Sequence, residues 1–334
     1  MTILFDNRWI GQHGIGRFAL EVGRAQCGFV SLNIDGRPSS ATDSLRLSAA
    51  LFNSDRPFFT PGYNFPLLGS VPYTMTVHDV NHFDIGGFSA SALSKRTYYS
   101  TLLRAGVRNA QRIFTVSDFS KKRISELFGV PLSNIVNVGN GVSETFFCDV
   151  SKGSMGVPYI LSVTNRKAYK NDVRALVAFS QCSRALKNDI HLFFMGDPNE
   201  RLVRLATELD VNHRVRFLGS LSEMELVALY KRSQAILFVS LYEGFGLPIV
   251  EAFASGVPCI TSKVTAMAET SNGAAYLCNP LSVASITHAI DRVLFDQALR
   301  RELIAAGLEQ VGRHTWSNTR GRVTRELRAL GWTG

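Results

Sequence analysis

The sequence has few of the features that mark secreted, membrane-spanning or metal-binding proteins. Its five cysteines are an odd number and lie far apart, and no C-x-x-C pair offers a zinc or redox site. Apolar runs such as 235–239 are far shorter than the roughly 18 residues of a membrane-spanning helix. The first residues, MTILFDNRW, lack the basic start and apolar stretch of a signal peptide. These absences predict a cytoplasmic protein that is soluble or peripheral at the inner face of a membrane.

Low-complexity segments, internal repeats and glycine- or proline-rich linkers are also missing. The chain has 334 residues, of which 46% are hydrophobic and 19% charged. This composition excludes an extended disordered protein, and the length is enough for two domains that each bury a core.

Positive charge is concentrated in one stretch of the chain. The net charge is +9, and residues 95–123 contain eight basic residues against the single acid Asp118. One interpretation is a solvated helix face, because lysine and arginine are good helix formers that usually point outward. The other is an anionic partner such as a membrane surface or a lipid diphosphate. No nucleic-acid-binding motif is present, so nucleic acid is not an expected partner.

Short apolar runs bounded by turn residues alternate with helical patterns, which predicts parallel strands joined by helices. Strands are expected at 3–5, 29–32, 73–77, 112–116 and 135–138, and again at 159–163, 191–195, 215–218, 235–239 and 259–261. These two series predict an α/β protein with two doubly wound domains, at 1–153 and 154–314. Residues 315–334 are expected to form a helix that crosses back to the first domain. Ligands of such sheets bind at the carboxyl ends of the strands.

The segment YEGFGLPIVE at 242–251 follows a predicted strand directly. Its glycines allow the backbone to approach a ligand closely, and the helix that begins near Leu247 presents free N–H groups to a negative or hydroxyl-rich partner. Glu243 lies on the loop and Glu251 lies in the helix, so each can accept hydrogen bonds from different hydroxyls. The alternative is that Glu243 only caps the helix and Glu251 is a surface acid.

The longer string SLYEGFGLPIVEAFASGVPCITS resembles the E-x7-E signature of glycosyltransferase family 4. The resemblance implies a GT-B fold, two Rossmann-like domains facing a central cleft, and transfer with retention of configuration. The family's first glutamate contacts the donor sugar and its second holds the ribose hydroxyls, so these roles pass to Glu243 and Glu251. The backbone N–H groups of Phe245, Gly246 and Leu247 would bind sugar hydroxyls or the donor phosphates.

The segment TNRKAYKN at 164–171 follows the first strand of the second domain. Three cations at the end of a strand suit a diphosphate, whose charge grows as the glycosidic bond breaks. Taken alone, the segment is also consistent with an exposed basic turn. The resemblance matches Lys170 to the family lysine that contacts the diphosphate. Thr164 stands where the family arginine is usual, so Arg166 or Lys167 would replace it.

The segment GQHGIGRFA at 11–19 contains G-x-G-x-x-A, and Asp35 follows it. This pattern also suits a dinucleotide site of an NAD(P)-dependent oxidoreductase. Residues 9–13, however, separate its first glycines from the end of the strand. The resemblance offers the glycine-rich loop of the family's N-terminal domain, in which Gly14 and Gly16 would touch donor phosphate and acceptor through the backbone.

The segment TVHDVNHFD at 76–84 has histidine and aspartate at spacings that suit a metal site. No other His–Asp cluster completes a coordination sphere and no D-x-D motif is present, so no metal is expected. The resemblance instead places His78 near the donor sugar and lets Asp79 fix the loop.

The resemblance covers most of the chain and places Gly196 at the base-binding end of a strand. It favours mannose transfer from GDP-mannose to a saccharide or lipid-linked saccharide, because the short form with GIGR and Y-K-N is similar to mannosyltransferases of O-antigen and exopolysaccharide synthesis. Other UDP-, GDP- or dTDP-sugars and a non-catalytic sugar-nucleotide sensor remain alternatives. No cofactor besides the donor is expected. Acceptor specificity is expected in 38–63 and 84–94.

Overall fold

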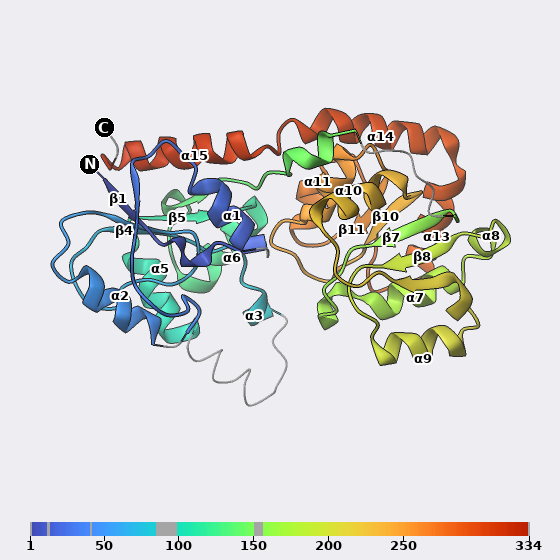
Figure 1. The fold of residues 1–334 in the computed structure, drawn as a ribbon, viewed down its shortest axis with the longest axis horizontal. Helices are drawn as coiled ribbons and strands as arrows, with labels where there is room; N and C mark the ends of the chain where they lie inside the picture. The colour runs from blue at the N-terminus through green and yellow to red at the C-terminus, as the bar shows by residue number, and fades with distance from the viewer. Residues whose placement is uncertain (1, 12–13, 41, 85–98, 150–155, 333–334) are drawn as a thin grey trace. The chain divides into compact units, whose positions relative to one another are not determined.

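A computed structural model describes residues 2–11, 14–40, 42–84, 99–149 and 156–332. The chain divides into two compact units (Figure 1). Unit 1 comprises Met1–Gly141 together with Trp316–Gly334, and unit 2 comprises Val142–Thr315. The domain boundary expected at 153/154 lies outside the described residues, and the division follows Gly141.

Unit 1 is built on a six-stranded parallel sheet with the order β2-β1-β3-β4-β5-β6. Its strands are β1 (Ile3–Phe5), β2 (Phe29–Ser31), β3 (Phe58–Thr60), β4 (Tyr73–Thr76), β5 (Arg112–Thr115) and β6 (Ile135–Asn137). All strands except β3 were predicted. The short run Phe58–Thr60 was missed because Pro57 and Pro61 flank it, and proline normally argues against a central strand.

The helices of unit 1 pack against this sheet and against one another. They are α1 (Gly14–Val22), α2 (Asp43–Leu51), α3 (Asn81–Asp84), α5 (Arg104–Asn109), α6 (Asp118–Phe128) and α15 (Trp316–Ala329), with the short 3-10 helices η1 (Asn7–Trp9) and η3 (Leu132–Asn134) and the π-helix η2 (Tyr99–Leu103). Helix α15 packs beside α1 (Figure 1). Arg320 of α15 lies 3.0 Å from Glu21 of α1, and the side chains of Val323 and Leu327 are fully buried. The last helix of the chain is therefore part of the first unit.

Unit 2 contains a second six-stranded parallel sheet with the order β12-β11-β10-β7-β8-β9. Its strands are β7 (Tyr159–Ser162), β8 (His191–Phe194), β9 (Val215–Phe217), β10 (Ala235–Phe238), β11 (Cys259–Ser262) and β12 (Tyr276–Cys278). The strand missed by the sequence is β12, an edge strand whose Leu277 points to solvent. Residues 274–278 read AAYLC, an apolar run of the kind that indicates a strand, so this strand could have been recognised from the sequence.

Helices cover both faces of the second sheet. They are α7 (Asp172–Ser180), α8 (Ser183–Lys187), α9 (Glu200–Glu208), α10 (Glu223–Arg232), α11 (Leu247–Ala254), α12 (Ala266–Ser271), α13 (Val283–Phe295) and α14 (Gln297–Val311), with turns η4 (Glu144–Phe147), η5 (Ala168–Lys170) and η6 (Asn212–Arg214). Alternation along β8 directs Leu192 and Phe194 into a core shared with α7, α9 and α13. The intervening Phe193 stacks on Tyr159, whose hydroxyl bonds the Leu229 carbonyl of α10.

Both sheets reverse their winding direction once, and this determines where loops can form a site. In unit 1 the reversal lies between β1 and β3, and in unit 2 it lies between β7 and β10. Chains leave neighbouring strands in opposite directions at such a point, so the loops at the carboxyl ends separate and leave room for a ligand. The loops that follow β7 and β10 contain Lys170 and Glu243.

Candidate active site

Lys170 and Glu243 form an ion pair at the reversal point of unit 2. Lys170 ends η5, Glu243 follows β10, and the distance from Nζ to Oε1 is 2.7 Å. Their side chains are only 13% and 15% exposed, so water screens the pair less than it screens a surface pair. The ammonium also lies 5.1 Å from the ring centroid of Phe238 and 5.4 Å from that of Tyr169. The loops after two neighbouring strands therefore present one cation and one carboxylate together.

Asn171 holds the loop that carries Lys170. Its backbone is left-handed, with φ 65°, and its buried side-chain amide donates to the carbonyls of Val239 and Pro280. The Tyr169 carbonyl accepts a further bond from the amide of Leu241. These bonds connect the loop after β7 to the ends of β10 and β12, so the position of Lys170 is defined by the sheet.

Arg166 occupies a different environment from Lys170. Its guanidinium lies 5.1 Å from the ring centroids of both Phe194 and Phe217, and it donates to the carbonyls of Gly196 and Asp197. It also lies 3.4 Å from Asp172. Burial lowers the pKa of Arg166, although the carboxylate opposes that shift.

These contacts place Arg166 against the ends of β8 and β9. The neighbouring Lys167 is exposed. Which of the two takes the place of the family arginine toward a diphosphate stays a prediction.

Gly196 follows β8 in a left-handed conformation, with φ 82°. Its amide and carbonyl both bond Gly219, which forms an isolated bridge beyond β8 and β9. The carbonyl of Gly196 also accepts from Arg166. Gly196 is thus at the carboxyl edge of the sheet, as its sequence position predicts, and its expected contact with the nucleotide base is untested.

The turn before α11 requires glycine at position 246 because of its backbone conformation and the close approach of Ile249. Gly246 has φ 103°, and a Cβ there would lie 2.9 Å from Cδ1 of Ile249. The preceding Phe245 is held through its carbonyl by the Thr270 hydroxyl, and the Glu243 amide donates to the Thr265 hydroxyl. The turn through Phe245, Gly246 and Leu247 is therefore fixed from α12 as well as from α11.

Glu251 lies inside α11, on a side of the helix that faces α10. Its carboxylate accepts a 2.6 Å hydrogen bond from the hydroxyl of Tyr230, a fully buried residue of α10. Burial raises the pKa of Glu251 to about 7, while the bond from Tyr230 acts in the opposite direction. A carboxyl group held this way can change protonation near neutral pH, which is unusual for a surface glutamate.

The unit 1 candidates lie on α1 and at the end of β4. Gly14 is the exposed first residue of α1, and Gly16, two residues further on, is buried. The ring of His78 lies edge-on to Phe18 of α1, with centroids 4.8 Å apart, and its Nε2 lies 3.0 Å from the carbonyl oxygen of Pro61. The Asp79 carboxylate accepts from the Asn81 amide, which supports its predicted role in fixing the loop.

Gly16 is required by backbone packing. A Cβ at Gly16 would lie 2.5 Å from the carbonyl oxygen of Gly11, a contact with main chain that no side-chain rotation relieves. This close approach explains the glycine at this position without a dinucleotide. The neighbouring loop residues 12 and 13 lie outside the described part of the chain.

We expect Gly16→Ala to lower the free energy of unfolding of unit 1 by about 1–3 kcal/mol, since the added methyl group overpacks the loop. Gly321→Ala is the matched control, because a Cβ at that helical position meets no atom within 4 Å. The control should leave stability unchanged or raise it by up to about 1 kcal/mol. Urea unfolding of both variants measures the difference, and equal curves would show that the backbone contact is absent.

Two arginines of the basic stretch form ion pairs within unit 1, and a third donates to a backbone carbonyl. Arg123 forms ion pairs with Asp84 and Glu126, Arg112 lies 3.4 Å from Glu326, and Arg108 donates to the carbonyl of Phe128. Lys95 and Arg96 lie outside the described residues. An anionic membrane surface as partner therefore stays a prediction. No described helix is both long and apolar enough to span a bilayer.

Sequence reasoning missed several polar residues near the predicted ones. In unit 2 these are Tyr230, Thr265 and Thr270, which bond Glu251, Glu243 and Phe245. In unit 1 they form a buried group on residues 6–64, part of which lies in the segment 38–63 where only acceptor specificity was expected. Their only sequence signal is polar side chains next to strand ends, which is too common to be diagnostic. Among the described residues, no three His, Cys, Asp or Glu side chains are grouped to hold a metal ion.

Comparison with proteins of known sequence gives matches in both halves of the chain. The family described as glycosyl transferases group 1 matches residues 149–310, and Glycosyltransferase Family 4 matches residues 50–146. The serotype-specific mannosyltransferase WbdA of Escherichia coli is 29% identical over 239 residues, 67% of this chain and 29% of WbdA. O-antigen chain mannosyltransferase B of E. coli is 28% identical, over 73% of this chain and 66% of that protein. Glycogen synthase of Mycobacterium tuberculosis is 28% identical, over 72% of this chain and 59% of that protein. This chain thus spans less than a third of WbdA and under two thirds of the glycogen synthase.

Solved structures share the whole fold. Sucrose-phosphate synthase from Thermosynechococcus elongatus superposes with a TM-score of 0.80 and 18% identity, covering 99% of each chain. HepE from Anabaena, solved in complex with UDP-glucose, superposes with a TM-score of 0.77 and 17% identity, covering 98% of this chain and 100% of that one. These likenesses confirm the predicted GT-B architecture of two Rossmann-like α/β units. Because the two family models together match most of the sequence, the chain belongs to the GT-B glycosyltransferases with a family 4 N-terminal region and a group 1 C-terminal region.

Proposed function

We propose that the protein transfers a sugar, with retention, from a nucleoside diphosphate sugar to a saccharide or lipid-linked saccharide in polysaccharide synthesis. The observation that carries this proposal is the Lys170–Glu243 pair at the reversal point of the unit 2 sheet. A cation and a carboxylate fixed 2.7 Å apart can exchange their mutual bond for bonds to a phosphate and to a sugar hydroxyl.

Each residue has a separate role in the proposed transfer. Lys170 neutralises the charge that develops on the leaving diphosphate, and Glu243 orients the donor sugar through its hydroxyls. Glu251 accepts hydrogen bonds from the ribose, while the backbone at Phe245 and Gly246 contacts the donor. In unit 1, His78 and the backbone at Gly14 and Gly16 contribute donor contacts. The rate enhancement comes from positioning and charge stabilisation, with no resident metal and no side-chain nucleophile.

GDP-mannose is the donor that we propose first, because two of the compared relatives are mannosyltransferases. The glycogen synthase relative and the UDP-glucose complex of HepE support glucose and UDP as the alternatives. Thermal shifts with GDP, UDP, dTDP and ADP decide the nucleotide, and we expect GDP to give the largest rise in melting temperature. A larger rise with another nucleotide would replace the proposed donor. Failure of all four to stabilise the protein would contradict donor binding.

Retention of configuration is tested on the product itself. Proton NMR of the first product from an α-linked donor should show an α anomer, with or without EDTA in the assay. A β anomer would contradict the retaining mechanism. Loss of turnover in EDTA that is restored by Mg²⁺ or Mn²⁺ would contradict only the proposed independence from metal.

Nucleotide affinity should rise with pH because of Glu251. Burial raises its pKa to about 7 from an ordinary value of 4.5. Between these pH values the folded protein holds a proton on Glu251 that the unfolded chain has lost. The stability that this proton contributes is therefore fully present below the ordinary pKa and is lost as the pH rises through about 7. The ribose needs the ionised carboxylate as acceptor. Calorimetry of GDP should thus show tighter binding at pH about 8 than at pH about 6.

Glu251→Gln is the control for this pH dependence. The variant lacks the titrating group, so any pH dependence that it retains comes from the nucleotide phosphates or from other residues. The wild-type protein should therefore gain more affinity than the variant across the same pH interval. Parallel profiles would show that Glu251 does not titrate in the nucleotide site.

A further inference from the structure

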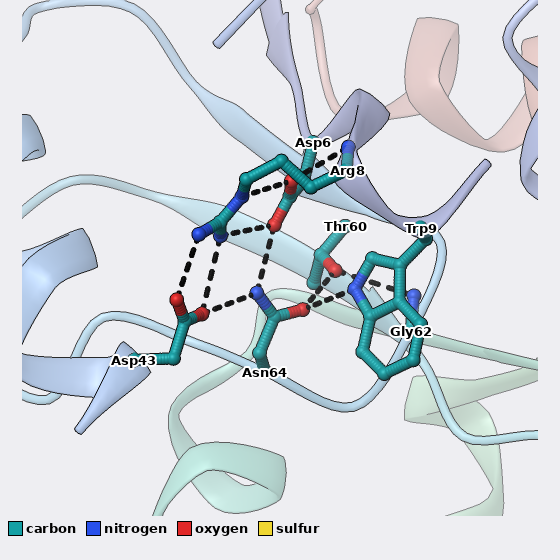
Figure 2. Close-up of polar contacts among 7 residues, drawn as sticks. All are labelled: Asp6, Arg8, Trp9, Asp43, Thr60, Gly62 and Asn64. Carbon is teal, nitrogen blue, oxygen red and sulfur yellow. Dashed lines mark hydrogen bonds and ion pairs between the residues drawn. The ribbon is translucent and has the colours of Figure 1, made fainter. Parts of the chain in front are cut away.

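Unit 1 contains a network of buried polar side chains at its own reversal point, between the carboxyl ends of β1 and β3 (Figure 2). We call this group the Asn64 network; its members are Asp6, Arg8, Trp9, Asp43, Thr60 and Asn64. Each side chain is less than 10% exposed. Burying so many polar groups is costly unless each is bonded, and the fold would usually place apolar residues there.

Arg8 lies between two buried carboxylates and makes forked bonds to both. Its guanidinium nitrogens lie 2.7–2.8 Å from the oxygens of Asp6 and 2.7–3.1 Å from those of Asp43. Burial acts to lower the pKa of Arg8, but the bonds to the two aspartates outweigh it and the pKa is raised. Two carboxylates against one guanidinium leave a formal negative charge, which favours a hydrogen-bond donor as the remaining partner.

Asn64 is that donor, and all of its bonding capacity is used. Its amide nitrogen donates to Asp6 at 2.7 Å and to Asp43 at 2.9 Å. Its amide oxygen accepts from the indole N–H of Trp9 at 2.7 Å and from the Thr60 hydroxyl at 2.5 Å. A side-chain amide has two donor hydrogens and two acceptor lone pairs, so its orientation admits no alternative here.

The network restrains the backbone between Thr60 and Asn64 at both ends. The Thr60 hydroxyl accepts from the Gly62 amide, and the Gly62 carbonyl accepts from the amide of Thr76 in β4. The Trp9 ring also packs on Gly62, where a Cβ would lie 2.2 Å from the indole. Pro61 stands within this restrained segment, so the direction of its carbonyl is fixed.

That carbonyl lies 3.0 Å from Nε2 of His78. A carbonyl oxygen only accepts hydrogen bonds, so Nε2 must carry a hydrogen. In the neutral ring, Nδ1 is then the nitrogen with the lone pair. Phe18 packs edge-on against the ring at 4.8 Å and limits its rotation.

We propose that the Asn64 network acts as a positioning device for His78, holding the Pro61 carbonyl so that the neutral imidazole keeps its hydrogen on Nε2 and its acceptor on Nδ1. Thr60, Asn64 and Trp9 are positioning residues. The tautomer follows from unit 1 alone, whereas its consequence for turnover rests on the proposed role of His78 toward the donor sugar.

Long-range proton–nitrogen NMR of protein labelled with ¹⁵N-histidine reads the tautomer directly. The chain has seven histidines, and the His78 signals are those lost in His78→Gln. The wild-type ring should show hydrogen on Nε2. Thr60→Val removes the hydroxyl at constant volume, and Trp9→Phe removes the indole N–H while keeping a ring beside Gly62. Both should move His78 toward a mixture of tautomers.

Two matched variants separate positioning from general damage to the core. Thr60→Ser keeps the hydroxyl and should restore the wild-type spectrum. Thr74→Val makes the same exchange at another fully buried threonine, whose hydroxyl has no hydrogen-bond partner in the part of the chain that the structure describes. It should leave the spectrum and turnover unchanged. In the transferase assay, Thr60→Val and Trp9→Phe should lower kcat about tenfold, with a smaller change in KM.

The outcomes separate this proposal from the proposed function. A wild-type tautomer in both Thr60→Val and Trp9→Phe, with both variants folded, would overturn the positioning role. An equal loss of the wild-type His78 tautomer in Thr60→Ser and in Thr60→Val would also overturn it. If Thr60→Val does not fold, Trp9→Phe decides the question. If Thr60→Val and Trp9→Phe shift the His78 tautomer while the wild-type protein is inactive with every donor, the network is supported and the transferase assignment is refuted.

Discussion

Lys170→Ala is expected to lower kcat/KM by about a hundred- to a thousandfold, the usual cost of removing one group that stabilises developing charge. The ammonium of Lys170 is held by η5 and by the Glu243 carboxylate, and its position follows from the Asn171 bonds to β10 and β12. A preorganised cation needs little rearrangement as the leaving group gains charge. The effect should therefore appear in kcat as well as in donor affinity.

Two controls test this interpretation of Lys170. Lys167→Ala removes an exposed lysine from the same loop and should have less than about a tenth of the effect if Lys167 only adds charge near the surface. The double variant Lys170→Met/Glu243→Gln removes both charges, so no unpaired carboxylate remains partly buried. If the double variant recovered wild-type turnover, the loss in Lys170→Ala would come from the stranded glutamate. We expect the double variant to stay inactive.

The sequence predicted ten strands, and all ten appear in the structure within about one residue of the expected ends. Most of them are buried along their whole length, as is typical of parallel strands covered on both faces, whereas β2 and β9 are partly exposed. The two that were missed are informative. Strand β3 is flanked by prolines, which argue against a central strand, so it depends on its neighbours in the sheet more than on its own sequence. Strand β12 lies in the apolar run AAYLC at 274–278 and could have been recognised from it.

The candidate site residues also divide into those whose placement could be predicted from the sequence and those whose placement could not. Glu243, Lys170 and Gly196 follow strand ends, and parallel strands bring such ends to one edge, so their placement could be predicted from order along the chain. The Asn64 network could not be predicted, because Asn64 lies 58 residues from Asp6 and 21 from Asp43. Tyr230 likewise meets Glu251 only through the packing of α10 on α11. Contacts of this kind depend on packing geometry that no local pattern encodes.

The two glutamates of the signature should respond differently to replacement. Glu243 pairs with Lys170 at the sugar end of the proposed site, so Glu243→Ala should lower turnover while GDP binds nearly as before. Glu251→Ala should weaken GDP itself, because a charge-assisted bond to the ribose is lost. The expected rise in dissociation constant is about tenfold to a hundredfold, or about 1.5–3 kcal/mol, as measured by calorimetry.

Tyr230→Phe provides the matched test for Glu251, since it removes the 2.6 Å hydroxyl bond to the carboxylate while leaving both the carboxylate and the ring in place. If Glu251 binds ribose, Tyr230→Phe should weaken GDP less than Glu251→Ala does, because only the orientation of the carboxylate is lost. The pH at which GDP affinity rises should also be higher in this variant, since the Tyr230 bond holds the pKa of Glu251 down. Equal losses of GDP affinity in Glu243→Ala and Glu251→Ala, with both variants folded, would show that the roles are misassigned. Unchanged affinity and turnover in both would reduce the signature to the start of a helix.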